Sequence, residues 1–157
     1  MSNMEAAVLF ESVASTPPVV FASFSNEDAV ALGIAAVDVI RERGLNLAVD
    51  VVRGGDLLFR AKLGTTNVEN DPWLAGKAAT VREYGVPSLL VRLRHDVEGQ
   101  PFEEREVDGI VLRAAGGSIP LFVDDEIVGT LTMSGEPDTV DHETALAAIA
   151  KFVSRNR

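Results

Sequence analysis

The last third of the chain, residues 116–152, reads GGSIPLFVDDEIVGTLTMSGEPDTVDHETALAAIAKF and contains its clearest structural signals. Two apolar runs, residues 119–123 and 127–133, flank an Asp-Asp turn, a pattern typical of a β-hairpin. An acidic residue and a proline then end the second run, and a helix is expected to begin near Asp138 or Thr139. This stretch therefore predicts a hairpin followed by a helix.

The middle of the chain predicts another helix and another hairpin. Apolar residues recur at helical spacing over residues 26–43, Ser25 is a suitable N-cap, and Gly44 stands where a left-handed C-cap belongs. Residues 47–51 and 57–61 then alternate between apolar and polar side chains on either side of the turn sequence RGGD.

The region between the two hairpins is harder to assign. Asp71 is a suitable N-cap and a proline follows it, which predicts a helix that ends at Tyr84. Residues 89–93 alternate like a strand, and the charged residues 96–106 are expected to form a mobile excursion. Residues 107–115 fit either a helix or a strand, and the double glycine that follows them favours a helix.

These elements predict one α+β domain over residues 1–157, with five antiparallel strands and three or four helices packed on the sheet. A further helix is expected over residues 4–13, where Pro17 and Pro18 would end the helical pattern. Residues 1–17 are therefore interpreted as an N-terminal helical extension of the domain.

Composition limits the function classes. The net charge of −10 argues against nucleic-acid binding, which requires clustered Lys and Arg side chains. Cysteine is absent, which excludes disulfides, thiolate metal sites and a cysteine nucleophile. Neither a membrane-spanning run nor a secretory leader is recognised, so we expect a cytoplasmic protein with no membrane partner.

Four chemically varied side chains are expected along one side of the helix over residues 72–84. Trp73, Lys77, Thr80 and Tyr84 recur at helical spacing. They offer a stacking surface, a cation and two hydrogen-bonding groups, which suits one side of a ligand pocket. The alternative is a boundary stripe, in which the two aromatic rings are half-buried and the lysine stem passes beside them.

His142 is the second candidate for ligand binding. It lies in the first turn of the last helix, where the helix dipole disfavours a cationic imidazole, so this histidine is expected to be neutral. A neutral imidazole can ligate haem iron or another metal. The alternative is a structural histidine at the edge of the core, hydrogen-bonded to a backbone carbonyl.

No metal centre or catalytic residue is assigned. Asp141, His142 and Glu143 are consecutive, and consecutive helical side chains point about 100° apart, so the three cannot converge on one ion. His95 is expected to follow a strand and to end in solvent. No residue pattern in the sequence predicts a catalytic group.

The block quoted above, together with LGTTNVENDPWLAGKAATVREYG upstream, resembles the haem-degrading-domain family, also called GlcG-like or HbpS-like, in a branch without an assigned activity. The resemblance extends from Phe24 to Phe152. The chain departs from that branch in two respects: Gly76 precedes Lys77 where the branch usually has a basic residue, and residues 124–126 replace the usual glycine-containing turn with an acidic one. The positions that match are Trp73, Lys77, Thr80, Gly116, Gly117, Pro120, Gly129, Ser134, Gly135, Asp141 and His142.

The resemblance implies a profilin-like fold, a five-stranded antiparallel sheet with helices on both faces, and self-association into homo-oligomers. Some relatives bind haem, so haem is the candidate cofactor, and no catalytic residue is carried over. Three functional hypotheses stay open: a module that binds a small ligand such as haem, an enzyme that acts on haem or a small metabolite, and an adaptor without a ligand.

Overall fold

The computed structural model describes residues 1–156 and contains five α-helices and seven strands within them. The helices are α1 (Asn3–Ser15), α2 (Asn26–Arg43), α3 (Asp71–Tyr84), α4 (Ser88–Glu98) and α5 (Asp138–Arg155), with a short 3₁₀ helix, η1 (Val68–Asn70), before α3. The strands are β1 (Val19–Phe21), β2 (Ala48–Arg53), β3 (Asp56–Lys62), β4 (Glu106–Val107), β5 (Ile110–Val111), β6 (Ser118–Val123) and β7 (Glu126–Ser134).

The main sheet has five strands in the order β1-β6-β7-β2-β3. The β2–β3, β2–β7 and β6–β7 pairs are antiparallel, as predicted, whereas β1 pairs with β6 in parallel. Strands β4 and β5 form a separate two-stranded ribbon. The α+β class and the five-stranded sheet are confirmed, with one parallel pair in an otherwise antiparallel sheet.

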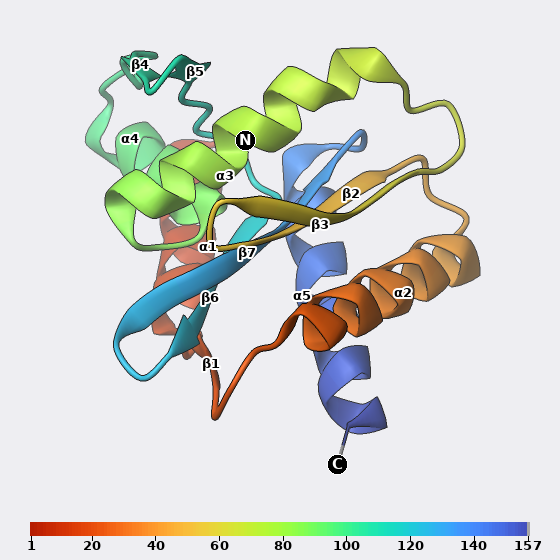
Figure 1. Cartoon of the computed structure of the whole chain (residues 1–157). Coiled ribbons are helices and arrows are strands. Elements are labelled where there is room, and N and C mark those ends of the chain that lie inside the picture. The colour runs from red at the N-terminus through yellow and green to blue at the C-terminus, as the bar shows by residue number, and fades with distance from the viewer. Residues whose placement is uncertain (157) are drawn as a thin grey trace.

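Helices cover both faces of this sheet (Figure 1). Helices α2 and α5 lie on one face and α3 lies on the other, while α1 packs against α4 to one side. Among residues 1–156, no helix is long and apolar enough to cross a bilayer.

Two sequence predictions for the middle of the chain were wrong. Residues 89–93 form part of helix α4 rather than a strand, because Leu89, Leu90 and Leu93 share the helical face that packs on α1. The fifth strand is instead β1, which depends on pairing with the distant β6. Residues 107–115 form no helix, since Asp108 and Gly109 both adopt positive φ in the turn between β4 and β5.

The helix termini follow their local sequence. Ser25 caps α2 through a capping box with Asp28, and Gly44 ends it with a φ of 63°. Helix α3 begins one residue earlier than predicted, because Asn70 is the N-cap and the Asp71 carboxylate instead bonds Lys62 Nζ at 2.8 Å. Gly85 ends α3 in the left-handed conformation, as expected.

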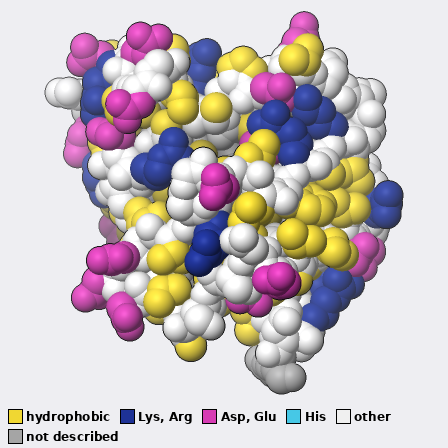
Figure 2. Space-filling view, viewed as in Figure 1, with side chains coloured by type: hydrophobic (Ala, Val, Ile, Leu, Met, Phe, Trp, Pro, Cys, Tyr) yellow, Lys and Arg dark blue, Asp and Glu magenta, His cyan; other side chains and the backbone are white. Residues whose placement is uncertain are grey.

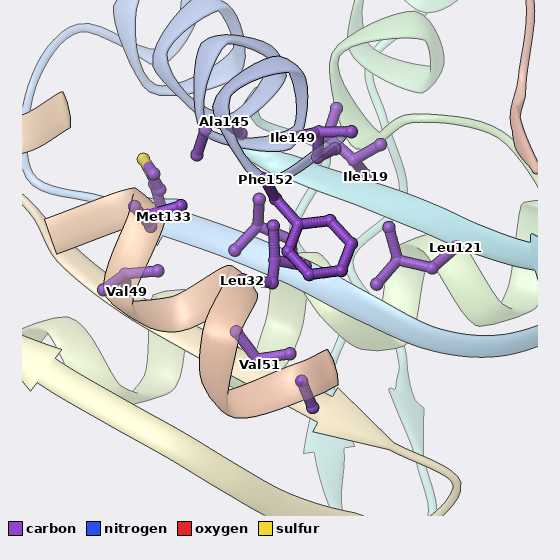
Figure 3. Packing of buried hydrophobic residues seen from close by; sticks show 14 of the residues in the cluster. Leu32, Val49, Val51, Ile119, Leu121, Met133, Ala145, Ile149 and Phe152 are labelled. Carbon is purple, nitrogen blue, oxygen red and sulfur yellow. The ribbon is translucent and has the colours of Figure 1, made fainter. Parts of the chain in front are cut away.

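The two faces of the sheet differ in chemistry. The face towards α2 and α5 is an apolar core (Figure 3). Because successive strand residues alternate between faces, the opposite face, under α3, receives Asp50, Thr130, Thr132 and Ser134. The apolar side is formed by Leu32, Val49, Val51, Ile119, Leu121, Leu131, Met133, Ala145, Ile149 and Phe152, among others.

Candidate functional site

The polar members of the α3 stripe are buried under the helix. Lys77 is 3% exposed, and its Nζ donates to the Met133 carbonyl oxygen at 2.9 Å and to Asp141 Oδ2 at 3.0 Å. Thr80 is fully buried; its hydroxyl donates to the Gly76 carbonyl at 2.8 Å. The two Lys77 bonds tie α3 to the sheet and to α5.

The two aromatic members of the stripe are half-exposed and contact the segment that follows α4. Trp73 is 42% exposed and lies under the Arg113 guanidinium, 4.7 Å from its ring centroid. Tyr84 is 38% exposed and packs against Phe102, with ring centroids 6.1 Å apart. The stripe is thus divided between two buried polar side chains and two half-exposed rings, which contact the loop that follows α4.

Gly76 allows the loop that follows α4, which includes Val111 and Arg113, to approach α3 closely. The Arg113 amide donates to the Gly76 carbonyl at 3.2 Å and to the Thr80 hydroxyl at 2.9 Å. A Cβ at position 76 would lie 2.5 Å from the Val111 carbonyl oxygen. A side chain there would therefore push the loop away from the helix.

A buried ion pair fixes the start of α5. Asp141 accepts from Lys77 Nζ through Oδ2 and from the Glu136 amide through Oδ1, the latter at 3.0 Å. Burial raises the pKa of Asp141 to about 6, and the Lys77 ammonium opposes that rise. Burial likewise lowers the pKa of Lys77. Gly117 leaves room for the pair, since a Cβ there would lie 3.1 Å from the Lys77 nitrogen.

His142, the next residue, points to a different place. It lines a cavity of about 320 Å³ between the end of α1, the α3–α4 connection, β6 and α5. The lining is mostly apolar and includes Val13, Pro18, Leu90, Ile119, Phe122 and Leu146. A largely apolar hollow next to a titratable side chain suits a small-ligand site.

The His142 imidazole is neutral and has a free ring nitrogen. The residue is 7% exposed, and its Nδ1 has no hydrogen-bond partner within residues 1–156. Burial lowers the pKa of His142, although the carboxylates of Asp138 and Glu143 act in the opposite direction. The structural alternative, a hydrogen bond from the imidazole to a backbone carbonyl, does not occur within residues 1–156.

The neighbours of His142 diverge from it. Asp141 points to Lys77, and Glu143 lies 3.8 Å from Arg43 across the surface of α2 and α5. Within the described 156 residues, no group of three or more His, Asp or Glu side chains could hold a metal ion.

His95 occupies a different environment from the one predicted. It lies in α4, its Nδ1 is 2.8 Å from the Val91 carbonyl oxygen, and its ring packs edge-on against Phe102. The prediction that it follows a strand and ends in solvent was wrong, because α4 continues through this position. His95 therefore has a partner where His142 has none.

With this geometry established, the relationship to known proteins becomes informative. The family model described as "Haem degrading protein HbpS-like" matches residues 24–150. The chain belongs to the HbpS-like family. This HbpS-like protein is 40% identical over 136 residues to the UPF0303 protein SCO2848 of Streptomyces coelicolor, covering 85% of the chain and 86% of the relative. A UPF0303 protein of Brucella melitensis, BMEI0598, is 29% identical and covers 87% of the chain and 82% of the relative.

Solved structures share the fold of the HbpS-like protein. Ybr137w superposes with a TM-score of 0.79 at 23% identity, covering 97% of this chain and 94% of that one. A PduOC complex with haem superposes with a TM-score of 0.67 at 22% identity, covering 82% and 94% of the two chains. HbpS itself gives a TM-score of 0.64 at 19% identity, covering 86% and 92%.

Sequence reasoning identified His142 but not the cavity beside it. Val13, Pro17 and Pro18 line that cavity from before the region that the family model matches. The only sequence signal in this segment is the double proline. It predicts the end of a helix but not which distant elements pack against that end. The partner of Lys77, 64 residues away, was likewise beyond the reach of a periodicity argument.

Proposed function

We propose that this HbpS-like protein binds a small, largely apolar ligand in the His142 cavity, with haem as the first candidate. The observation that carries the proposal is the neutral, buried imidazole whose Nδ1 has no partner in residues 1–156 and which borders an apolar space. An unmet hydrogen-bonding group in a buried position costs about 1–3 kcal/mol. A ligand that hydrogen-bonds to this nitrogen, or a metal ion that coordinates it, would recover that cost.

The residues present fit haem in two respects. Haem would supply an iron atom that binds a neutral nitrogen ligand, and it requires an apolar surrounding. His142 offers the nitrogen, and Leu90, Ile119, Phe122 and Leu146 offer apolar contact. At about 320 Å³ the cavity is near the lower end of the range of roughly 300–1,000 Å³ for ligand pockets, which suits a compact ligand or one edge of a larger one.

The family membership supports the same ligand class. The family takes its description from haem degradation, and PduOC, which shares the fold, was solved as a complex with haem. Self-association belongs to the same proposal and is supported by exposed hydrophobic side chains over α2, among them Val30 and Ile34 (Figure 2). The composition favours a cytoplasmic location.

Titration with haemin tests the proposal directly. We expect a saturable Soret shift in the wild type and its loss in His142→Ala. His95→Ala is the matched control, since it removes the other histidine, whose Nδ1 already bonds Val91, and should leave the titration unchanged. A Soret shift that survives His142→Ala would exclude axial ligation by His142 and overturn the haem form of the proposal.

The same preparation separates the enzyme and adaptor hypotheses. Loss of haem absorbance with reductant and oxygen, faster than for free haem, would indicate an enzyme. An oligomeric protein that carries no ligand in native mass spectrometry and leaves the haemin spectrum unchanged would favour the adaptor and contradict ligand binding.

A further inference from the structure

A second hollow lies on the α3 side of the sheet. It has a volume of about 230 Å³, and its lining includes Val52, Arg82, Val128, Gly129 and Thr130. Unlike the His142 cavity, it is formed by the turn ends of both hairpins and by the last turns of α3. None of its lining residues belongs to the site described above.

Irregular strand pairing shapes this hollow. The β6–β7 register shifts between Leu121 and Phe122, which leaves Val128 as the extra residue of β7. The β2–β3 register shifts beside Val52, on the neighbouring strand. Such β-bulges bend the sheet and re-aim its side chains, and they are frequent next to functional sites. Gly129 lets the strands approach there, because a Cβ would lie 2.4 Å from the Val52 carbonyl oxygen.

The hollow contains a buried hydroxyl without a partner. Thr130 is 2% exposed, and its Oγ1 makes no hydrogen bond within residues 1–156. Other hydroxyls on this face are paired, as in the 2.8 Å contact between Ser118 and Thr132. Most buried hydroxyls have a hydrogen-bond partner, so the unpaired Thr130 hydroxyl is available to a ligand.

An exposed cation, Arg82, borders the same hollow. Its guanidinium forms no ion pair with any described residue. Arg60, on the same side of the sheet, is instead held by two bonds to Asp50, at 2.7 and 2.8 Å. Arg82 is therefore the cation available to an anionic ligand, and a guanidinium binds carboxylates well.

An apolar trench continues from the hollow. It has a volume of about 440 Å³ and shares Val52, Gly54 and Arg82 with the hollow. Leu57, Ala75 and Ile110 supply apolar lining, and the paired Asp50 and Arg60 also border it. An anionic head group at Arg82 could thus place an alkyl chain in the trench. Phosphate or sulfate would leave this apolar surface uncovered.

We propose that Arg82 and Thr130 form a binding site for a short aliphatic monocarboxylate. The guanidinium binds the carboxylate, the Thr130 hydroxyl donates to one of its oxygens, and the alkyl chain lies between α3 and β3. The site is independent of the His142 cavity, so haem binding and carboxylate binding can succeed or fail separately.

Titration of hexanoate at pH 7.5, followed by amide NMR, tests the site. We expect saturable shifts at Gly54, Gly129 and Thr130. Arg82→Gln should weaken binding about tenfold or more, since hydrogen bonds to charged groups are the strong ones. Thr130→Val keeps the side-chain shape and removes only the hydroxyl, so it should stay folded and weaken binding about threefold to tenfold.

Three controls make the result decisive. Arg94→Gln, on the exposed side of α4, should bind hexanoate like the wild type. Ala75→Leu should weaken hexanoate by filling the trench while leaving acetate binding unchanged. Inorganic phosphate and 1-hexanol should each bind at least about tenfold more weakly than hexanoate. The proposal would be overturned if the amides of Gly54, Gly129 and Thr130 do not shift, or if Arg82→Gln binds hexanoate as tightly as the wild type. It would also be overturned if phosphate or 1-hexanol binds as tightly as hexanoate.

Discussion

The two faces of the sheet are stabilised in different ways. Towards α2 and α5 the strands present Val49, Ile119 and Leu131, and stability there depends on filling volume. Towards α3 they present hydroxyls and charges that, apart from the Thr130 hydroxyl, are matched to partners, such as Ser118 with Thr132 and Asp50 with Arg60. Stability on that face depends on pairing, so it should respond differently to the loss of one group and the loss of both.

The buried ion pair gives the largest expected difference. Lys77→Met leaves the Asp141 carboxylate buried without its ammonium, and we expect a loss of about 3–5 kcal/mol in the free energy of unfolding. Urea denaturation at pH 7.5 measures it. Lys62→Met is the matched control, because its ion pair with Asp71 is partly exposed and should be worth about 1 kcal/mol or less.

The double variant Lys77→Met with Asp141→Leu sharpens this test. Replacing both partners removes the unpaired charge, so the double variant should be more stable than Lys77→Met alone. If the two single losses simply add, the stability of this face does not depend on pairing.

The apolar face should show the opposite behaviour. Leu131→Ala removes a fully buried side chain from the centre of the sheet and should cost about 2–5 kcal/mol, measured in the same urea experiment. A second truncation nearby, Ile119→Ala, should add to this loss rather than relieve it. Recovery in the double variant would show that the two faces follow the same rule.

The elements that sequence could predict are those whose signals are local. Helices α2 and α3 and the β6–β7 hairpin are each defined by caps, periodicity or turn residues that lie close together in the sequence. All three elements occur as expected. Strand β1 could not be found in this way, since its three residues are ordered by pairing with β6, about a hundred positions later. Helix α4 was misassigned because Leu89, Val91 and Leu93 also fit an alternating pattern, and only the contact with α1 decides between the two.

The candidate site shows the same division. The position of His142 at a helix start predicted a neutral imidazole, and burial in the structure acts in the same direction. The cavity beside it requires Val13 and Leu90, from two helices whose meeting no local pattern encodes. For Lys77 and Thr80 the spacing correctly placed them on one helix. Lys77 is buried against Met133 and Asp141, whereas Thr80 contacts the loop residue Arg113, and neither contact is encoded in the local pattern.

A smaller effect is expected from the paired hydroxyls. Thr132→Val keeps the shape of the side chain but leaves the Ser118 hydroxyl, 2.8 Å away in the wild type, without its partner. We expect a loss of about 1–2 kcal/mol in the free energy of unfolding. Adding Ser118→Ala should recover part of it. A double variant that is less stable than Thr132→Val would contradict the pairing rule at this position.

The smallest expected effect concerns His142, a buried titratable group at the edge of the two faces. Because its pKa is lowered in the folded protein, the unfolded chain takes up a proton first as the pH falls below about 6.5. Proton uptake by the unfolded state destabilises the fold, so the wild type should lose stability between pH 7.5 and 5.5 relative to His142→Phe, which cannot titrate. We expect the free energy of unfolding of the wild type, relative to that of the variant, to fall by up to about 1 kcal/mol between pH 7.5 and 5.5, measured by urea denaturation across the range.

Asp141 titrates near the same pH with the opposite effect on stability, because its raised pKa makes the native state the better proton acceptor. It is present in both proteins, so its contribution cancels in the comparison. Parallel stability curves for the two proteins would mean that the imidazole is protonated equally in the folded and unfolded states, and the neutral nitrogen required for ligation would then be absent at mildly acidic pH.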